Sequence, residues 1–217
     1  MRNIVMLGVQ GSGKGTQADR ISARYEIPTI STGKLFRAEI ERNTGLGREI
    51  SSIIKKGELV PAARINQMMG ERLSEEDTVN GVIVDGYPRT LEQAQALDDI
   101  MSGLSRQVTH VLYIKISDEE AVRRLSGRRV CSNNKCEANY HVEFNPPKKD
   151  PNRCDRCGSA LMQRADDNPE AIGRRLELYH KDTAPLVDFY KKKGTLHEVD
   201  GQQPIPDVEA VINGILA

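Results

Sequence analysis

The chain contains no tryptophan, only three phenylalanines among its 217 residues, and no excess of either charge. Lysines and arginines number 31, and aspartates and glutamates also number 31. A protein whose main partner is DNA or RNA usually carries a basic excess, because phosphate contacts dominate its affinity. The balanced charge therefore argues against a nucleic-acid partner, and any anion site must be built by gathering cations in one place.

Long apolar runs are missing as well. No stretch approaches the roughly 18–20 apolar residues that a membrane span requires, and the apolar start at residues 1–7 is too short for a signal peptide. We therefore expect a cytoplasmic protein with no membrane partner. A hydrophobic fraction of 38% is enough for the core of one domain, with room for a small inserted module.

Strand and helix patterns alternate along most of the chain. Apolar segments typical of buried strands occur at residues 4–9, 28–31, 82–84, 111–116 and 196–199. Helical patterns occur at residues 14–24, 35–73, 90–101, 117–125 and 207–216, and another begins at Asn168-Pro169. This alternation predicts an α/β domain with a mostly parallel sheet. Residues 128–163 show little helical periodicity and are interpreted as an insert.

The segment from Gly8 to Thr16 has the spacing of a phosphate-binding loop, Gly-x4-Gly-Lys, between a predicted strand and a predicted helix. Glycines let successive main-chain N–H groups turn inward around an anion, and the following helix adds its positive N-terminal end. Lys14 supplies a mobile positive charge. The alternative is a glycine-rich turn without a ligand, which the lysine and the strand–helix context disfavour.

All four cysteines fall in the insert, in the pattern Cys131-x4-Cys136 and Cys154-x2-Cys157. Clustered thiols in a reducing compartment favour a metal over disulfides. Four thiolates make a closed tetrahedral site, so we expect a structural zinc ion, with iron or unliganded thiols as alternatives. A nucleic-acid-binding zinc ribbon is disfavoured because the insert carries acidic as well as basic residues. His141 is interpreted as a lid or surface histidine rather than a further ligand.

Five short motifs occur in a fixed order, and together they are similar to the adenylate kinase family of the long, bacterial type. They are Gly13-Lys14-Gly15-Thr16, Ser31-Thr32-Gly33, Asp85-Gly86-Tyr87-Pro88-Arg89, Gly127-Arg128-Arg129 and Arg164-Ala165-Asp166-Asp167. The resemblance extends from residue 1 to about residue 201. It implies a three-layer P-loop NTPase fold with a five-stranded parallel sheet, a helical AMP-binding segment and an inserted zinc-binding lid.

The resemblance also implies domain boundaries and a reaction. The core would comprise residues 1–30, 61–126 and 164–217, the AMP-binding segment residues 31–60 and the lid residues 127–163. A monomer would transfer a phosphoryl group reversibly from ATP-Mg to AMP, giving two ADP. Such a transfer needs in-line oxygens and cations around the transferred group rather than a protein nucleophile, and guanidinium groups bind phosphate in a bidentate way.

Roles are carried over by motif position. Arg37 and Arg89 are implied to hold the AMP phosphate, Arg124 to pack on the ATP adenine, and Asp85 to hold water bound to Mg²⁺. Gln93 is expected on the same helical face as Arg89, where a glutamine of the family reads the AMP adenine. The implied catalytic residues are Lys14, Asp85, Arg89, Arg128, Arg164 and Arg175. Those implied to bind ATP are Gly11, Ser12, Gly13, Lys14, Gly15, Thr16, Arg124, Arg128, Tyr140 and Gln203. Those implied to bind AMP are Thr32, Arg37, Glu58, Leu59, Val60, Gly86, Arg89, Gln93, Arg164 and Arg175.

Three positions depart from the family's pattern. Gln10 replaces a usual proline, which removes a fixed φ angle from the loop. Lys34 replaces a usual aspartate, so that either the organisation of Mg²⁺ is weakened or a phosphate contact is added. Residues 62–65 lack the usual acidic residues. Two alternative functions therefore stay open: a kinase for another nucleoside monophosphate, and a catalytically weak paralogue that senses nucleotide.

Overall fold

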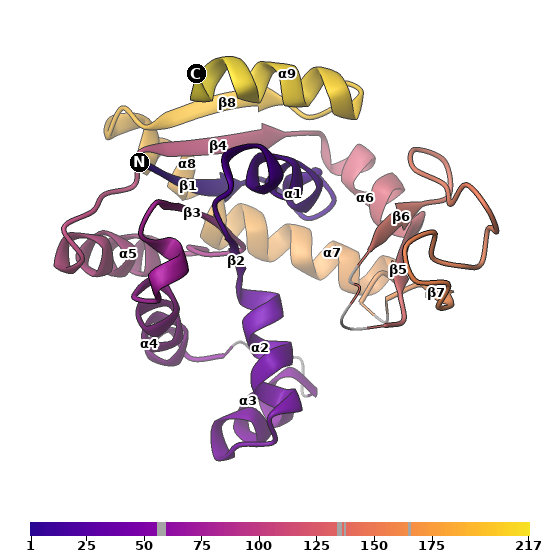
Figure 1. Ribbon diagram of the computed structural model, residues 1–217, viewed down its shortest axis with the longest axis horizontal. Coiled ribbons are helices and arrows are strands. Elements are labelled where there is room, and N and C mark those ends of the chain that lie inside the picture. The colour runs from indigo at the N-terminus through magenta and orange to yellow at the C-terminus, as the bar shows by residue number, and fades with distance from the viewer. Residues whose placement is uncertain (56–59, 134–135, 137, 165) are drawn as a thin grey trace.

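The centre of the molecule is a five-stranded parallel sheet. This computed structural model describes the chain except residues 56–59, 134–135, 137 and 165 (Figure 1). The strands lie in the order β2-β3-β1-β4-β8, and each neighbouring pair is parallel. They are β1 (Arg2–Leu7), β2 (Thr29–Ser31), β3 (Gly81–Asp85), β4 (His110–Lys115) and β8 (Leu196–Asp200). The predicted parallel sheet is confirmed.

Helices cover both faces of the sheet because its strands bury both rows of side chains. Along β1, Val5 and Leu7 face one cluster, while Ile4 and Met6 face the other. The first cluster packs against α4 (Ala62–Leu73), α5 (Leu91–Gly103) and α8 (Pro185–Lys192). The second packs against α1 (Lys14–Tyr25) and α9 (Ile205–Leu216). The result is the expected three-layer arrangement.

Polar residues start three of the helices as the sequence indicates. Thr90 accepts a hydrogen bond from the Gln93 N–H at the start of α5, and Ser117 accepts one from Glu120 at the start of α6 (Asp118–Ser126). Asn168 caps α7 (Pro169–Leu178), whose first residue is a proline. Each cap satisfies an N–H group that the helix leaves without a partner.

The predicted helical run at 35–73 is three separate helices. α2 (Thr32–Glu41) begins earlier than predicted, α3 (Gly45–Lys55) turns back against it, and α4 follows. The chain reverses at Asn43, which has a left-handed φ of 52°. Gly47 permits the close approach of the two helices, since a Cβ there would lie 2.2 Å from the Glu39 carbonyl oxygen. A short 3-10 turn at Glu76–Thr78 precedes β3.

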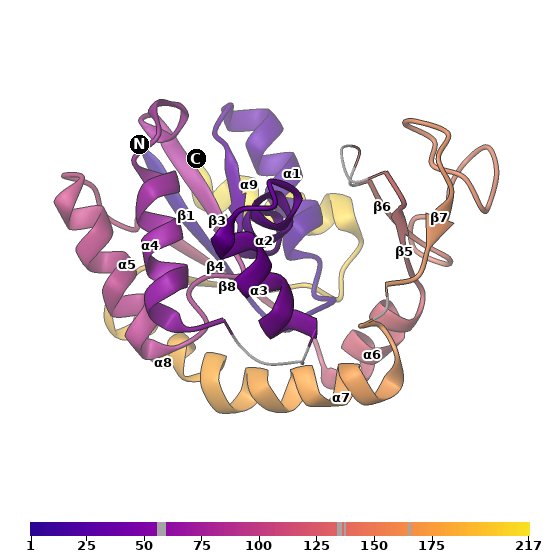
Figure 2. The same cartoon turned by 90° about the horizontal axis from the view of Figure 1, so that it is seen from below.

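The insert forms a second, antiparallel sheet in the order β6-β5-β7. Its strands are β5 (Arg128–Cys131), β6 (Asn139–His141) and β7 (Leu161–Met162). Figures 1 and 2 show it at one end of the molecule, with α7 extending from the core to its base, while α2 and α3 project separately. We call this insert, residues 127–163, the lid.

After α7 the helical path continues through a π-helical turn, Tyr179–Thr183, into α8. Pro185 explains the irregular turn, because proline has no N–H to donate and its ring displaces the carbonyl four residues earlier. Within the described part of the chain, no helix is long and apolar enough to cross a membrane.

Candidate active site

A cavity of about 1310 Å³ opens at the carboxyl ends of the parallel strands, where open α/β sheets bind their ligands. It is lined by the glycine-rich loop, the start of α2, the segment after β3, α6, α7 and the lid. Most of the predicted site residues line it: Gly11, Ser12, Gly13, Lys14, Gly15, Thr16, Thr32, Arg37, Asp85, Gly86, Arg89, Arg124, Arg128, Tyr140, Arg164, Arg175 and Gln203.

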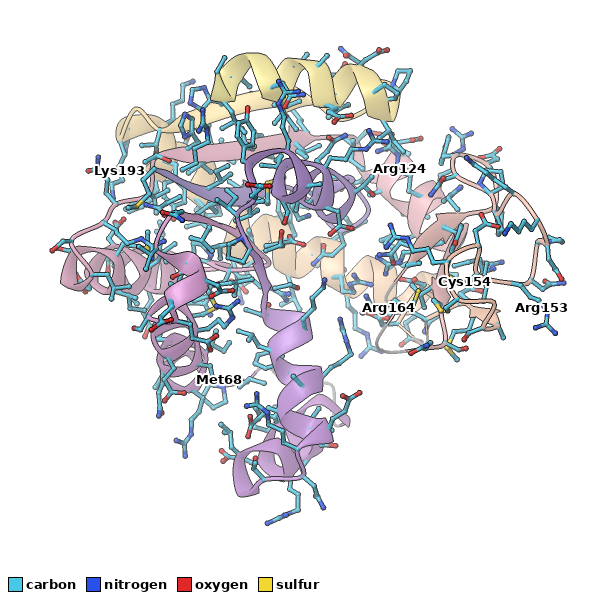
Figure 3. The ribbon with its side chains drawn as sticks, in the orientation of Figure 1. Met68, Arg124, Arg153, Cys154, Arg164 and Lys193 are labelled. Atoms are coloured by element: carbon cyan, nitrogen blue, oxygen red, sulfur yellow. The ribbon has the colours of Figure 1, made fainter. Side chains whose placement is uncertain are left out.

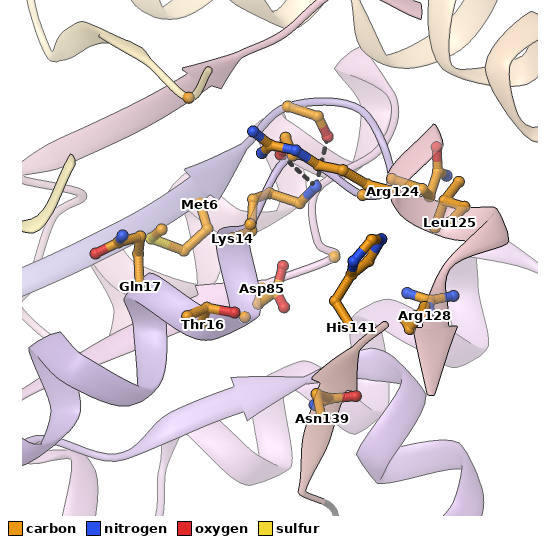
Figure 4. A pocket seen from close by; sticks show the side chains of 18 of the residues that line it. Met6, Lys14, Thr16, Gln17, Asp85, Arg124, Leu125, Arg128, Asn139 and His141 are labelled. Carbon is orange, nitrogen blue, oxygen red and sulfur yellow. Dashed lines mark hydrogen bonds between the residues drawn. The ribbon is translucent and has the colours of Figure 1, made fainter. Parts of the chain in front are cut away.

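The glycine-rich loop is shaped by its close packing on the sheet. Gly8 has a φ of 140°, and a Cβ there would lie 2.3 Å from the Ile114 carbonyl oxygen, so no other residue fits without a shift. Lys14 curls over the loop, and its Nζ donates to the carbonyl oxygens of Gly8 and Val9, both at 2.7 Å (Figure 4). The side chain of Lys14, the first residue of α1, is thus held against the loop.

Lys14 also lies in an unusual electrostatic environment. Its pKa is lowered to about 8, mainly by burial and also by the charges of Arg89, Arg175 and Arg128, while Asp85 opposes the shift. Asp85 ends β3 beside the first turn of α1, as its carboxylate lies 3.8 Å from where a Cβ of Gly15 would be. A cluster in which cations outnumber the nearby carboxylate favours the binding of a polyanion.

On the side of the cavity formed by α2 and the segment after β3, Arg89 is held through its own main chain. Its N–H donates to Gln93 Oε1 (2.7 Å), and its carbonyl accepts from Thr183 Oγ1 (2.9 Å). Its side-chain Nε and Thr32 Oγ1 both donate to the Gly86 carbonyl, at 3.0 and 3.1 Å. We call the group formed by Thr32, Gly86, Arg89, Gln93 and Thr183 the acceptor side.

The expectation that Gln93 shares a helical face with Arg89 is wrong. Arg89 precedes the cap of α5, which begins at Leu91, and the buried Gln93 side chain reaches back to the Arg89 main chain. Neither Gln93 nor the buried Val60 is part of the cavity lining. Glu58 and Leu59, expected in the AMP pocket, lie outside the described residues.

At the base of the lid, arginines are held by carboxylates. Arg128 makes two bonds to Asp167, from Nε (2.8 Å) and Nη2 (2.5 Å), and Asp167 is only 1% exposed. Arg164 pairs with Asp166 at 2.9 Å, and Arg175 contacts both aspartates, at 3.2 and 3.3 Å. These contacts keep the pKa of Asp166 below its usual range, although burial opposes that shift. We call the group formed by Arg128, Arg164, Asp166, Asp167 and Arg175 the lid side.

Asp166 and Asp167 were quoted above only as part of a motif, and the structure assigns them contacts that the motif does not reveal. The pairing joins the two places where the chain passes between core and lid, since Arg128 begins β5 and Asp167 immediately precedes the cap of α7. Arginines at one junction of the insert and two adjacent aspartates at the other are the signal that could have indicated it.

Arg124, near the end of α6, faces the lid. Its Nε donates to Glu120 (2.7 Å), and its Cζ lies 5.6 Å from the ring centroid of Phe144 in the lid. Figure 4 shows Arg124, Arg128 and His141 on the cavity wall, and Figure 3 shows Arg124 and Arg164 where the lid meets the core. His141, expected as a lid or surface histidine, lies in β6 of the lid and lines the cavity. The contacts leave Arg124 beside an aromatic wall of the cavity.

Inside the lid, the four cysteine sulfurs lie within 4.8 Å of one another and form no disulfide. Cys131 and Cys157 are 3.4 Å apart, and Cys136 and Cys154 are 3.6 Å apart. Four sulfurs around a zinc ion would be separated by about 3.8 Å, given the usual Zn–S distance. The residues present therefore fit a tetrahedral zinc site. Figure 3 places Cys154 in this cluster, well inside the lid compared with Arg153.

Tyr140 connects the cysteine cluster to the cavity. Its hydroxyl accepts from the Asp155 N–H (2.8 Å) and lies 3.5 Å from Cys154 Sγ, while the residue also lines the cavity. Burial raises the pKa of Cys154, but hydrogen bonds from Tyr140 and from main-chain N–H groups outweigh burial and lower this pKa to about 6. A thiol that ionises this readily is suited to bind a metal.

The two departures inside the site both line the cavity. Gln10 lies in the glycine-rich loop, and its Oε1 is buried with no hydrogen-bond partner among the described residues. Lys34 lies in the first turn of α2, which has no acidic residue. A cation at the positive end of a helix is unfavourable unless an anion lies close by.

The parallel sheet, the glycine-rich loop ahead of α1 and the ring of cations define a P-loop nucleotide-binding protein. A family model described as adenylate kinase matches residues 6–195. The chain is 47% identical over 213 residues to an adenylate kinase of Lachnospira eligens, covering 98% of this chain and 99% of the relative. It is 49% identical over 214 residues to one of Bacillus pumilus, covering 99% and 97%. The chain belongs to the adenylate kinase family.

Proposed function

We propose that this protein transfers the γ-phosphoryl group of ATP reversibly to AMP, giving two ADP. The observation that carries the proposal is the cavity itself, which has a phosphate loop on one wall and Thr32, Arg37 and Arg89 on another. Two anionic nucleotides need two sets of cations facing a common space. Lys14 lies between these sets and is influenced by Arg89 on one side and Arg128 on the other.

ATP would occupy the wall formed by the loop and the lid. Main-chain N–H groups of residues 11–16 would surround its phosphates, as in other glycine-rich loops ahead of a helix. Arg124 and Tyr140 would contact the adenine, with Gln203 across the cavity near Asp200. A guanidinium group stacks well on an aromatic face, which suits the position of Arg124 beside Phe144.

AMP would occupy the acceptor side. Arg37 and Arg89 would hold its phosphate through bidentate bonds, and Thr32 and Gly86 would line the space around it. Gln93, together with residues 58–60, remains the candidate for the adenine, although Gln93 Oε1 is engaged by the Arg89 N–H here.

The transfer requires no protein base, because the attacking phosphate oxygen of AMP is already ionised near neutral pH. The chain would supply position and charge. Lys14 would leave the loop carbonyls and follow the transferred group. Arg128, Arg164 and Arg175 would exchange the carboxylates of Asp166 and Asp167 for phosphate oxygens, which strengthens the positive field where negative charge develops.

Two metals accompany this proposal. Asp85, at the carboxyl end of β3, would hold water molecules of the Mg²⁺ that arrives with ATP, and that ion, when bound, neutralises phosphate oxygens. The four cysteines would hold a structural zinc ion that keeps the lid one rigid body, with iron as the alternative metal. That the protein is a monomer stays a prediction.

A panel of nucleoside monophosphates, each assayed with ATP by coupled detection of ADP, tests the proposal. We expect AMP to be the preferred acceptor, and preferential turnover of UMP or GMP would indicate another monophosphate kinase. Lys34→Asp, assayed beside wild type, tests the departure from the family's pattern. A large gain in turnover would favour the weak, nucleotide-sensing paralogue, and an unchanged or lower rate would favour Lys34 as a phosphate contact.

A further inference from the structure

Three hydrogen bonds fix Arg89, and one of them comes from a distant part of the chain. Gln93 and Gly86 are within four residues of Arg89 in sequence. Thr183 is 94 residues away, and its Oγ1 donates to the Arg89 carbonyl at 2.9 Å. Thr183 also lines the cavity. The Thr183 hydroxyl therefore ties the acceptor side to the helical run that contains α7 and α8.

The irregular turn after α7 makes this hydroxyl available. A threonine inside an α-helix commonly donates its hydroxyl to a carbonyl three or four residues earlier. Thr183 instead ends the π-helical turn, in which the Ala184 N–H reaches back to the Tyr179 carbonyl at 2.8 Å. Pro185 follows and prevents a regular turn. Local widening of this kind re-aims side chains and is frequent at functional sites.

The same helical run also carries a cation of the lid side. Arg175 lies near the end of α7, and its Nη1 donates to the Asp166 carbonyl (3.1 Å) and contacts Asp167. Arg175 and the donor to Arg89 therefore belong to one packed element. Tyr179, at the start of the π-helical turn, packs with Val9 of the glycine-rich loop. The run thus contacts the loop, the lid side and the acceptor side.

We propose that Thr183 is a positioning residue for phosphoryl transfer, because its hydroxyl fixes the Arg89 peptide and thereby the guanidinium group that receives the acceptor phosphate. The inference rests on the proposed function, in which Arg89 binds AMP. Small displacements of a group that orients a reactant reduce the rate strongly. The Thr183 hydroxyl would thus act on the acceptor nucleotide and not on ATP.

The test compares Thr183→Val, which keeps the shape but removes the donor, with Thr183→Ser, which keeps the donor. Steady-state assays would give kcat and separate KM values for AMP and ATP. We expect Thr183→Val to raise KM for AMP by about three- to tenfold, the loss expected for one hydrogen bond. KM for ATP should stay within twofold, and Thr183→Ser should restore the wild-type values.

An equal rise in both KM values, or failure of serine to restore the AMP value, would overturn the inference in favour of a general packing role. Thr183→Ala serves if the valine variant does not fold, as checked by its thermal midpoint. In an Arg89→Ala background the same valine substitution should change KM for AMP by less than twofold, because Thr183 acts through Arg89. An undiminished effect there would also overturn the inference.

The wild-type control separates this inference from the function on which it rests. If wild type does not phosphorylate AMP, the proposed function fails and the inference fails with it. If wild type turns over AMP and Thr183→Val matches it in every parameter, only the positioning role is lost.

Discussion

The two sides of the cavity hold their arginines by different means. On the acceptor side, Arg89 is held through its main chain by Gln93 and Thr183 and through Nε by the Gly86 carbonyl, and no carboxylate among the described residues forms an ion pair with it. On the lid side, Arg128 is held by its side chain, through the buried carboxylate of Asp167. The first arrangement leaves the guanidinium group ready for a phosphate, while the second occupies it with another anion.

The difference indicates how the two sides are used. A cation without a carboxylate partner has no ion pair to break before it binds a phosphate, so the acceptor side is preorganised. A cation paired with a buried carboxylate must give up strong, charge-assisted bonds first. The lid side therefore fits a part that changes its contacts when nucleotide binds, and the aspartates hold its arginines together until then.

The largest effect is expected at Lys14, which lies between the two sides. Lys14→Met removes the cation that would follow the transferred group, so kcat should fall about 10³-fold. A steady-state assay with saturating ATP and AMP measures it. The matched control is Lys193→Met, which breaks an ion pair with Asp98 (2.5 Å) far from the cavity and should change kcat by less than twofold. Near-normal turnover of the Lys14 variant would contradict a central role for this cation.

Zinc removal should loosen the lid and leave the core domain folded. A zinc ion present at about 100 times its dissociation constant stabilises by about 2.7 kcal/mol, so chelation should lower the thermal midpoint by roughly 5–10 °C. The core sheet should stay folded, because its clusters share no residue with the cysteine cluster. Calorimetry and circular dichroism with and without a chelator measure both effects. Complete unfolding at room temperature would show that the lid is not an independent part.

Asp167→Asn tests whether the aspartates restrain the lid side. Loss of this buried charge should destabilise the fold by about 1–3 kcal/mol, yet Arg128 would be less neutralised, so ATP should bind two- to fivefold more tightly. AMP affinity should change less, because Arg175 keeps its contact with Asp166. Titration calorimetry measures the affinities, with Asp118→Asn, which affects an exposed pair with His180, as the control. Weaker ATP binding would mean that Asp167 supports the nucleotide-bound arrangement.

The sequence predicts which arginines line the two sides of the cavity, but not which residues hold them. The motifs identify Arg89, Arg128, Arg164 and Arg175, and the structure brings all four to one cavity. Strand and helix periodicity predict the parallel sheet, and the family resemblance implies the helical layers on its two faces. The partners of these arginines were missed, because Asp167 and Thr183 act through geometry that a hinge and a π-helical turn create. Gln93 was misjudged for a similar reason, since α5 begins only after the cap at Thr90 and Arg89 lies outside the helix.

The smallest effect that we expect is the uptake of a proton by Lys14 when ATP binds. Lys14 has a pKa of about 8 in the nucleotide-free protein, and bound phosphates favour its charged form and raise that pKa. Between these two pKa values, ATP binding takes up a fraction of a proton, and ATP affinity falls as the pH rises through about 8. Titration calorimetry at pH 8.5 in buffers of different ionisation enthalpy measures the uptake. Lys14→Met should abolish it, and uptake that persists in this variant would assign the proton to another group.

The most direct test titrates AMP and ATP separately into Arg89→Ala and Arg128→Ala. Arg129→Ala is the control, since Arg129 donates to main-chain carbonyls and is not part of the cavity lining. We predict that Arg89→Ala loses at least tenfold in AMP affinity and keeps that for ATP, while Arg128→Ala shows the reverse. If each variant loses affinity for both nucleotides to the same extent, the division of the cavity into an acceptor side and a lid side is wrong.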